Sequence, residues 1–186
     1  MPHFTLAADV TALLIIDMQE KFLPAIPAMA ADQFCGRNVR ILANAFRLLK
    51  LPTMISEQYP KGLGRTLPWI AEVCPDAVLA EKTHFSCCDD EALMLCLDRQ
   101  GRRTLVLCGV EAHVCVLATV ADLVTRGYDV VIAGDAVASR QGEHCAQALA
   151  AMRDLGALVV PSESIVFRLL KQAGTPVFKQ VSALVR

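Results

Sequence analysis

Short apolar runs alternate with longer segments of helical periodicity along the chain. The apolar runs have the length of strands and fall at residues 12–17, 53–57, 77–83, 104–108, 129–133 and 157–160. Segments with apolar residues at three- and four-residue spacing occupy residues 32–50, 89–100, 114–126, 143–155 and 163–171. This alternation is typical of βαβ units and predicts an α/β fold on a six-stranded, mostly parallel sheet.

The ends of the helical segments carry their own signals. Gly101, Gly127 and Gly156 each follow such a segment directly, where a left-handed cap favours glycine. Asp89 and Ser162 precede two others, where their side-chain oxygens can cap free amide groups. With no repeat, linker or low-complexity stretch between the elements, we expect one domain over residues 1–186.

The apolar content is high, with 54% hydrophobic residues and a mean hydropathy of +0.43. No run approaches the ~20 apolar residues that a membrane-spanning helix needs, so we expect no membrane association. The excess instead predicts strands covered on both faces and a subunit interface, and hence a homo-oligomer.

Charge and cysteine content narrow the class of protein further. The 18 basic and 19 acidic residues are scattered and give a net charge of -1, so no basic stripe predicts a nucleic-acid partner. Eight cysteines would suit a secreted disulfide scaffold, but a chain of 186 residues can build a core without disulfides. The first residues also do not read as a secretory signal. We therefore expect free thiols and a cytoplasmic location.

Three residues with catalytic side chains lie at or just beyond the ends of expected strands. Asp17 ends LLIID, Lys82 ends AVLAEK, and Cys115 follows TLVLC through the turn GVEAH. In an open parallel sheet the ligand crevice lies beyond the carboxyl ends of the strands. If the strand order is 3-2-1-4-5-6, Asp17 lies beside Cys115, and Lys82 is roughly 10 Å from strand one, which a lysine side chain can largely span.

These three residue types together indicate nucleophilic catalysis. A helix that begins at Cys115 would lower the pKa of its thiol, and the amide groups there could bind an oxyanion. Asp17 could accept the proton, while Lys82 could keep Asp17 ionised and stabilise negative charge on the substrate. Each has a structural alternative: a buried thiol for Cys115, a helix cap for Asp17 and a solvated strand end for Lys82.

Four segments resemble the isochorismatase-like cysteine hydrolases, a superfamily that includes nicotinamidases and N-carbamoylsarcosine amidases. They read LLIIDMQEKF, SEQYPKGLG, EKTHFS and GVEAHVCVLATVADL. The resemblance implies a Rossmann-like three-layer α/β/α fold of strand order 3-2-1-4-5-6. It also implies a triad of Asp17, Lys82 and Cys115 that forms a thioester. A cis peptide between Val110 and Glu111 would orient the amide groups of an oxyanion hole that includes Cys115.

Differences within the superfamily narrow the chemistry. Isochorismatases have glycine at the position of Cys115 and cleave a vinyl ether, whereas this chain keeps the thiol. Nicotinamidases have a metal-binding histidine after the second strand, and residues 58–68 contain none, so we expect no metal. A glycine-rich dinucleotide or phosphate loop is also missing, so we expect no cofactor.

Other polar and aromatic residues are weaker candidates. The expected pocket wall consists of Gln19, Phe22, Tyr59, Trp69 and His113, with simple packing as the alternative for each. His113 could also pair with Cys115 as a Cys-His dyad. We interpret Cys87 and Cys88 near His84 as incidental thiols, and Asp135 and Ser139 as residues that stabilise a loop.

The leading hypothesis is a cysteine hydrolase that cleaves the C–N bond of a small amide-type substrate. One alternative is a non-catalytic oligomeric α/β scaffold. Another is vinyl-ether hydrolysis by Asp17 alone, which would not need Cys115.

Overall fold

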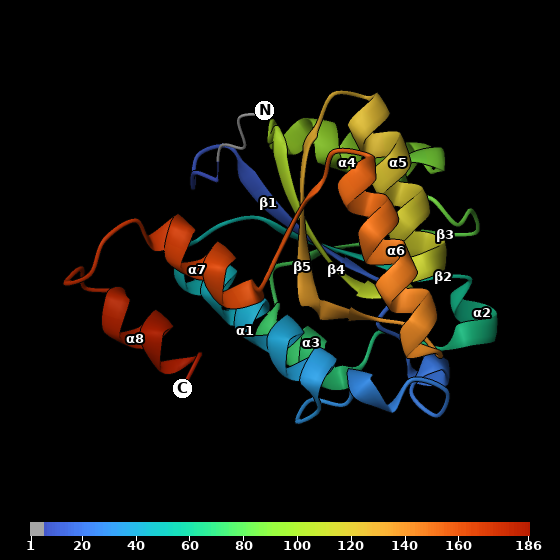
Figure 1. Ribbon diagram of the computed structural model, residues 1–186, viewed down its shortest axis with the longest axis horizontal. Coiled ribbons are helices and arrows are strands. Elements are labelled where there is room, and N and C mark those ends of the chain that lie inside the picture. Colours follow the sequence, from blue (N-terminus) through green and yellow to red (C-terminus); the bar gives the residue numbers. More distant parts are fainter. Residues whose placement is uncertain (1–5) are drawn as a thin grey trace.

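A six-stranded sheet forms the centre of the molecule, which Figure 1 shows as a computed structural model that describes residues 6–186. All strands are parallel and their order is β3-β2-β1-β4-β5-β6, so the fold and strand order expected from the sequence are confirmed. The strands are β1 (Thr11–Ile16), β2 (Thr53–Gln58), β3 (Val78–Lys82), β4 (Thr104–Val110), β5 (Asp129–Ala138) and β6 (Leu158–Val160).

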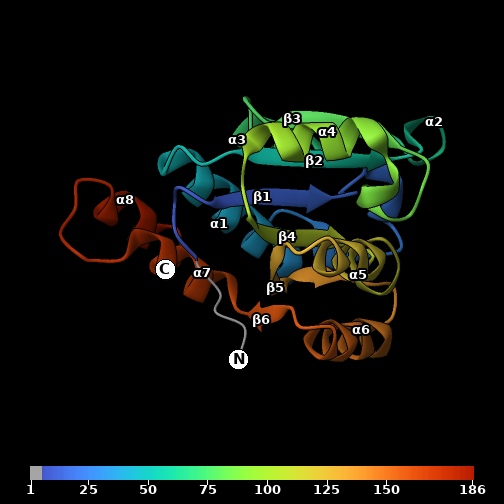
Figure 2. The same cartoon turned by 90° about the horizontal axis from the view of Figure 1, so that it is seen from above.

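Helices cover both faces of the sheet and make it the middle of three layers (Figure 2). One face carries α1 (Phe34–Leu48), α3 (Pro68–Val73), α7 (Ser162–Leu170) and α8 (Phe178–Ala183). The opposite face carries α4 (Glu91–Gln100), α5 (Leu117–Thr125) and α6 (Gly142–Asp154). The short α2 (Pro60–Leu63) follows β2 at the carboxyl edge of the sheet.

The central strands are buried on both faces, which accounts for much of the apolar content. Leu13 and Ile15 of β1 pack in the core under α1, whereas Leu14 and Ile16 pack in the core under α5. All six residues of β1 and all seven of β4 are buried. Within residues 6–186, no helix is both long and apolar enough to cross a membrane.

Several boundaries differ from the sequence-based expectations. The cap of α4 is Asp90, which accepts a hydrogen bond from the Leu93 amide, and not Asp89. Ser162 is the first residue of α7 and does not cap it, because its amide and hydroxyl both donate to Asp135. β5 continues to Ala138, five residues beyond its expected end. The glycine caps at Gly101, Gly127 and Gly156 have the expected positive φ.

Further short helical turns were not expected from the sequence. They are the 3-10 turns Glu20–Phe22, Pro27–Met29 and Cys87–Asp89 and the π-helical turn Ala112–Val116, together with α2, α3 and α8. The π-helical turn leads directly into α5, so the chain from β4 enters this helix through a wider first turn. That turn carries Cys115.

Close contact between β1 and β4 at the carboxyl edge requires glycine. Gly109 pairs with Ile16, the residue before Asp17, and has a φ of +116°. A Cβ atom at Gly109 would collide with the Ile16 carbonyl group. The absence of a side chain here therefore allows Asp17 and the turn after β4 to approach each other.

We expect Gly109→Ala to lower the free energy of unfolding by about 3 kcal/mol or more, because the alanine is both strained and overpacked. Gly142→Ala is the control, since a Cβ there has no neighbour within 4 Å and φ is not positive. Urea unfolding followed by circular dichroism measures both. Equal stability of the two variants would contradict this account of the β1–β4 contact.

Candidate active site

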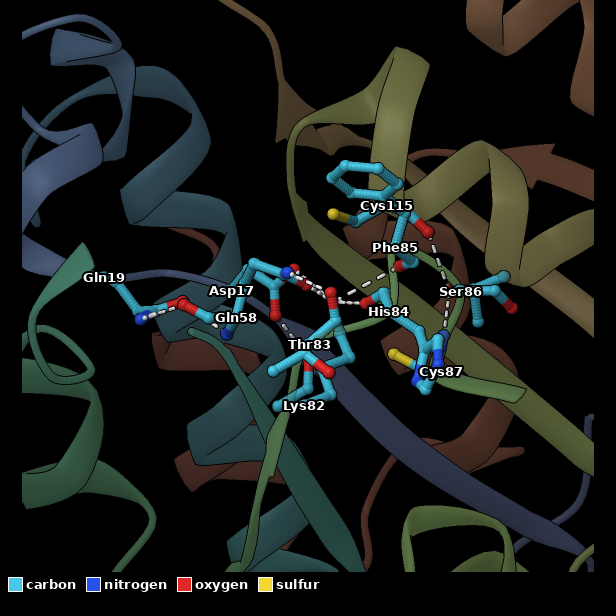
Figure 3. Close-up of polar contacts among 12 residues, drawn as sticks. Asp17, Gln19, Gln58, Lys82, Thr83, His84, Phe85, Ser86, Cys87 and Cys115 are labelled. Carbon is cyan, nitrogen blue, oxygen red and sulfur yellow. Dashed lines mark hydrogen bonds and ion pairs between the residues drawn. The ribbon is translucent and has the colours of Figure 1, made fainter. Parts of the chain in front are cut away.

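A buried ion pair joins two strands that are not neighbours in the sheet. The Lys82 Nζ, at the end of β3, lies 2.7 Å from the Asp17 Oδ2, just after β1, and neither side chain is exposed (Figure 3). β2 lies between these strands, so the lysine side chain spans the intervening strand. The structure thus brings together the two charged residues that the sequence analysis selected.

The intervening strand supplies two polar side chains that sequence reasoning missed. The Ser56 hydroxyl donates to the Asp17 Oδ1 at 2.7 Å, and the Gln58 Oε1 accepts from the Lys82 Nζ at 2.7 Å. The Gln58 Nε2 donates to the Thr83 carbonyl at 2.8 Å, which defines the orientation of this amide. Ser56 and Gln58 are two residues apart on β2, so their side chains face the same side of the sheet. This spacing could have identified them from the sequence.

The Lys82 ammonium is fully occupied by protein acceptors. Besides Asp17 and Gln58, it donates to the carbonyls of His84 at 3.3 Å and Phe85 at 3.2 Å (Figure 3). An ammonium has three hydrogens, which these four acceptors share. The second expected role of Lys82, direct stabilisation of charge on the substrate, therefore has no free hydrogen to support it.

Cys115 lies in the π-helical turn and is buried, with 4% of its surface exposed. Its thiol lies close enough to the Asp17 carboxylate for each group to shift the pKa of the other. Burial raises the pKa of Cys115 to about 12, and the Asp17 charge acts in the same direction, while Lys82 opposes it. The expectation that the start of the helix lowers this pKa is therefore wrong, because burial and the adjacent carboxylate outweigh the helix.

The same environment acts on the ion pair. Burial raises the pKa of Asp17 above its usual value, although the Lys82 charge and the hydrogen bonds from Lys82, Ser56 and Cys115 oppose this. Burial alone would lower the pKa of Lys82. The neighbouring groups that favour the ammonium, Asp17 first, outweigh burial and raise this pKa. The resting arrangement is consequently a neutral thiol beside a carboxylate that is paired with an ammonium.

The turn before Cys115 contains the main-chain amides that are candidates for an oxyanion hole. The peptide bond from Val110 to Glu111 is cis, at the expected position. The Glu111 carbonyl accepts from the amides of Val114 at 3.1 Å and Val116 at 3.2 Å. Within residues 6–186, the Cys115 amide donates to no main-chain acceptor outside this helical turn, so it is a candidate donor to a ligand oxygen.

The residues expected to form the pocket wall occupy different environments. Gln19 is fully buried, and its Nε2 donates to the carbonyls of Gln58 and Gly64, so it does not line a pocket. Phe22 and Trp69 are partly buried against the core under α1. Tyr59 is 53% exposed and lines a hollow of about 320 Å³.

The side chain of His113 interacts with Ser139 and His144. Its Nδ1 lies 2.9 Å from the Ser139 Oγ, and its ring centroid lies 4.8 Å from that of His144. In residues 6–186 no interaction of His113 with Cys115 is present, so the geometry does not support a Cys-His dyad. Ser139 therefore contacts His113, whereas Asp135 bonds to α7.

Cys87 and Cys88 are buried free thiols, and Cys87 lies close enough to Lys82 and Asp17 to interact with both. Burial raises the pKa of Cys87 to about 11 and that of Cys88 to about 12. Across the part of the chain that the structure describes, no group of three or more His, Cys, Asp or Glu side chains is placed to hold a metal ion.

Comparison with known proteins identifies the family of the chain. The isochorismatase domain matches residues 11–164, which include all three candidate residues. The chain belongs to the isochorismatase family. Human isochorismatase domain-containing protein 2 is 39% identical over 185 residues, which cover 95% of this chain and 83% of that protein.

Two solved structures of the same fold are also similar. The MAR1 ribonuclease from Caenorhabditis elegans has a TM-score of 0.87 and 36% identity, covering 96% of this chain and 91% of that one. YcaC from Pseudomonas aeruginosa, determined with hexane-2,5-diol and covalent acrylamide, has a TM-score of 0.89 and 25% identity, covering 98% and 93%. The three-layer fold is therefore shared with solved members of the family.

We expect Lys82→Met to lower the free energy of unfolding by roughly 3–5 kcal/mol, because it leaves the Asp17 carboxylate buried without its partner. The double variant Asp17→Asn/Lys82→Met removes both charges and should recover part of this loss. Chemical unfolding measures the effect, with the exposed Lys179→Met as control. A loss below 1 kcal/mol for Lys82→Met would be incompatible with a buried pair.

Proposed function

We propose that this protein hydrolyses the C–N bond of a small amide-type substrate through a thioester on Cys115. The observation that carries the proposal is the contact between the Cys115 thiol and the carboxylate of a fully buried ion pair. A buried carboxylate whose pKa is raised is a better proton acceptor than an ordinary aspartate.

In the first half of the reaction, the Cys115 sulfur attacks the carbonyl carbon while its proton passes to Asp17. The charge that develops on the carbonyl oxygen is stabilised by the Cys115 amide. Asp17 then gives the proton to the leaving nitrogen, the C–N bond breaks, and ammonia or an amine departs from the thioester. Lys82 holds Asp17 in place and ionised before and after this transfer.

Hydrolysis of the thioester uses the same groups. Asp17 takes a proton from a water molecule as its oxygen attacks the thioester carbonyl, and the Cys115 sulfur leaves with the proton that Asp17 returns. The products are a carboxylic acid and the regenerated thiol. In each half of the reaction the negative charge moves from Asp17 to the substrate oxygen and returns to Asp17 when the leaving group takes the proton, so the net charge of the site stays constant.

The two alternatives explain fewer features of the site. A non-catalytic scaffold gives no reason to maintain a buried ion pair, which well-packed apolar residues could replace without loss of stability. Vinyl-ether hydrolysis by Asp17 alone leaves the thiol at the carboxylate without a role. YcaC from Pseudomonas aeruginosa was obtained with covalent acrylamide, an electrophile that nucleophiles attack at its alkene, and this favours a reactive nucleophile over a silent scaffold.

We further propose that the protein acts on a small molecule, without cofactor or nucleic acid, as a homo-oligomer in the cytoplasm. All eight cysteines are free thiols, as in a reducing compartment. Leu79 and Leu95 are each 48% exposed, which suits burial against another subunit. The net charge of -1 does not favour binding of RNA. We therefore do not extend to this chain the activity in the name of the MAR1 ribonuclease.

Replacement of the nucleophile tests the proposal directly. We expect Cys115→Ala to abolish ammonia release from a panel of small amides, ureas and imides, because no thioester can form. Cys96→Ala, which removes a partly exposed thiol of α4, should keep full activity. Mass spectrometry of the quenched reaction should detect the acyl adduct on the peptide that contains residue 115. Activity that survives in Cys115→Ala would exclude the thioester mechanism.

The pH dependence of kcat/KM should report the ionisation of the Asp17 carboxylate. Asp17 must be ionised to accept the proton, so kcat/KM should fall as the pH drops through a pKa that lies above the ordinary 3.8. Ser56→Ala removes a donor to the carboxylate and should move this acidic limb upward by roughly one pH unit. Asp154→Asn, on the exposed end of α6, should leave the limb in place. A limb at or below 3.8 would contradict the role of Asp17.

A further inference from the structure

We infer that the substrate of this site is an uncharged amide, without a carboxylate or phosphate group near the scissile bond. This inference rests on the proposed function and narrows it to a chemical class. It follows from how the positive charges in and around the site are already used. The contacts of Lys82 carry the first part of the argument.

Among the described residues, the cation of the buried ion pair is not free to bind a substrate anion beside Cys115. The Lys82 ammonium is buried, and its hydrogens are directed to Asp17, Gln58 and two main-chain carbonyls. To bind a substrate carboxylate, Lys82 would have to release Asp17, which would then remain buried as an unpaired carboxylate. The other direct partner of the ion pair, Ser56, is neutral and donates its only hydroxyl hydrogen to Asp17.

Cations on the surrounding loops are also matched by carboxylates. The Arg140 Nε lies 3.0 Å from the Glu111 Oε2, beside the cis peptide. Arg65, in the loop after β2, pairs with both Glu57 and Glu81. A carboxylate or phosphate on the substrate would therefore compete with existing protein partners at each position.

The hollow next to Lys82 has no excess of basic residues. Lys61 and Lys82 are balanced there by Glu81 and Asp90, and Tyr59 is the aromatic side chain on its wall. Phe85, whose carbonyl binds Lys82, is 63% exposed, and Figure 3 shows its side chain on the same side as Cys115. These features favour a neutral substrate with an apolar substituent.

Two alkylating reagents of nearly equal size, one neutral and one anionic, test the inference. Iodoacetamide is a neutral amide and iodoacetate carries a carboxylate. In both reactions the Cys115 sulfur displaces iodide, a C–S bond forms, and the thiol proton passes to Asp17 and then to solvent. The measured quantity is the ratio of the two rates at Cys115 at neutral pH, read by peptide mass spectrometry and divided by the same ratio for a small free thiol.

We expect iodoacetamide to be favoured by about tenfold or more after this correction, because the anion must enter a site whose buried ammonium is already bound to Asp17. Phe85→Arg places a cation at the mouth and should reduce the preference several-fold, whereas Phe34→Arg, at the start of α1, should leave it unchanged. Circular dichroism verifies that both variants are folded.

Failure of this inference and failure of the proposed function give different labelling results. A corrected ratio near one, or a preference for iodoacetate, overturns the inference of an uncharged substrate and leaves the proposed hydrolase intact. Labelling of Cys115 by neither reagent, while the partly exposed Cys96 and Cys145 react, overturns the proposed nucleophile and this inference with it. The wild-type ratio alone decides the question if Phe85→Arg does not fold.

Discussion

A carboxylate and an ammonium that lie 2.7 Å apart without exposure to solvent constrain everything around them. Because β2 separates the two strands from which they come, the strand between them must be polar at its end, and Ser56 and Gln58 meet that need. The loop after β3 is likewise turned so that its carbonyls face the ammonium. The carboxyl edge of this sheet is thus organised to satisfy one buried pair, since each unsatisfied group there would cost several kcal/mol.

The pair also determines which form of the cysteine the site can hold. A thiolate beside Asp17 would place two negative charges against a single ammonium, and burial raises the cost of both. In the reaction that we propose, the thiol keeps its proton until a substrate carbonyl is attacked, and the carboxylate takes that proton in the same event. Activation of Cys115 in that proposal depends on a neighbouring base rather than on a lowered thiol pKa.

The sequence allowed the fold and part of the site to be predicted, because both depend on patterns along the chain. Alternating apolar and helical segments indicated the parallel sheet, and the polar residues that end strands indicated Asp17, Lys82 and Cys115. The sign of the Cys115 pKa shift was predicted wrongly, because it depends on burial and on the distance to Asp17. Gln19 was misplaced for a similar reason: whether a glutamine faces a pocket or bonds to the main chain depends on the conformation of the loop around Gly64.

The central claim is that the resting nucleophile is a neutral thiol held against an ionised carboxylate. Ultraviolet absorbance of the thiolate, taken as the difference between the wild type and Cys115→Ser during a pH titration, tests it most directly. We expect no thiolate signal from Cys115 at neutral or mildly alkaline pH, and its appearance only well above the ordinary thiol value of 9.0. A thiolate that forms below that value would contradict the account.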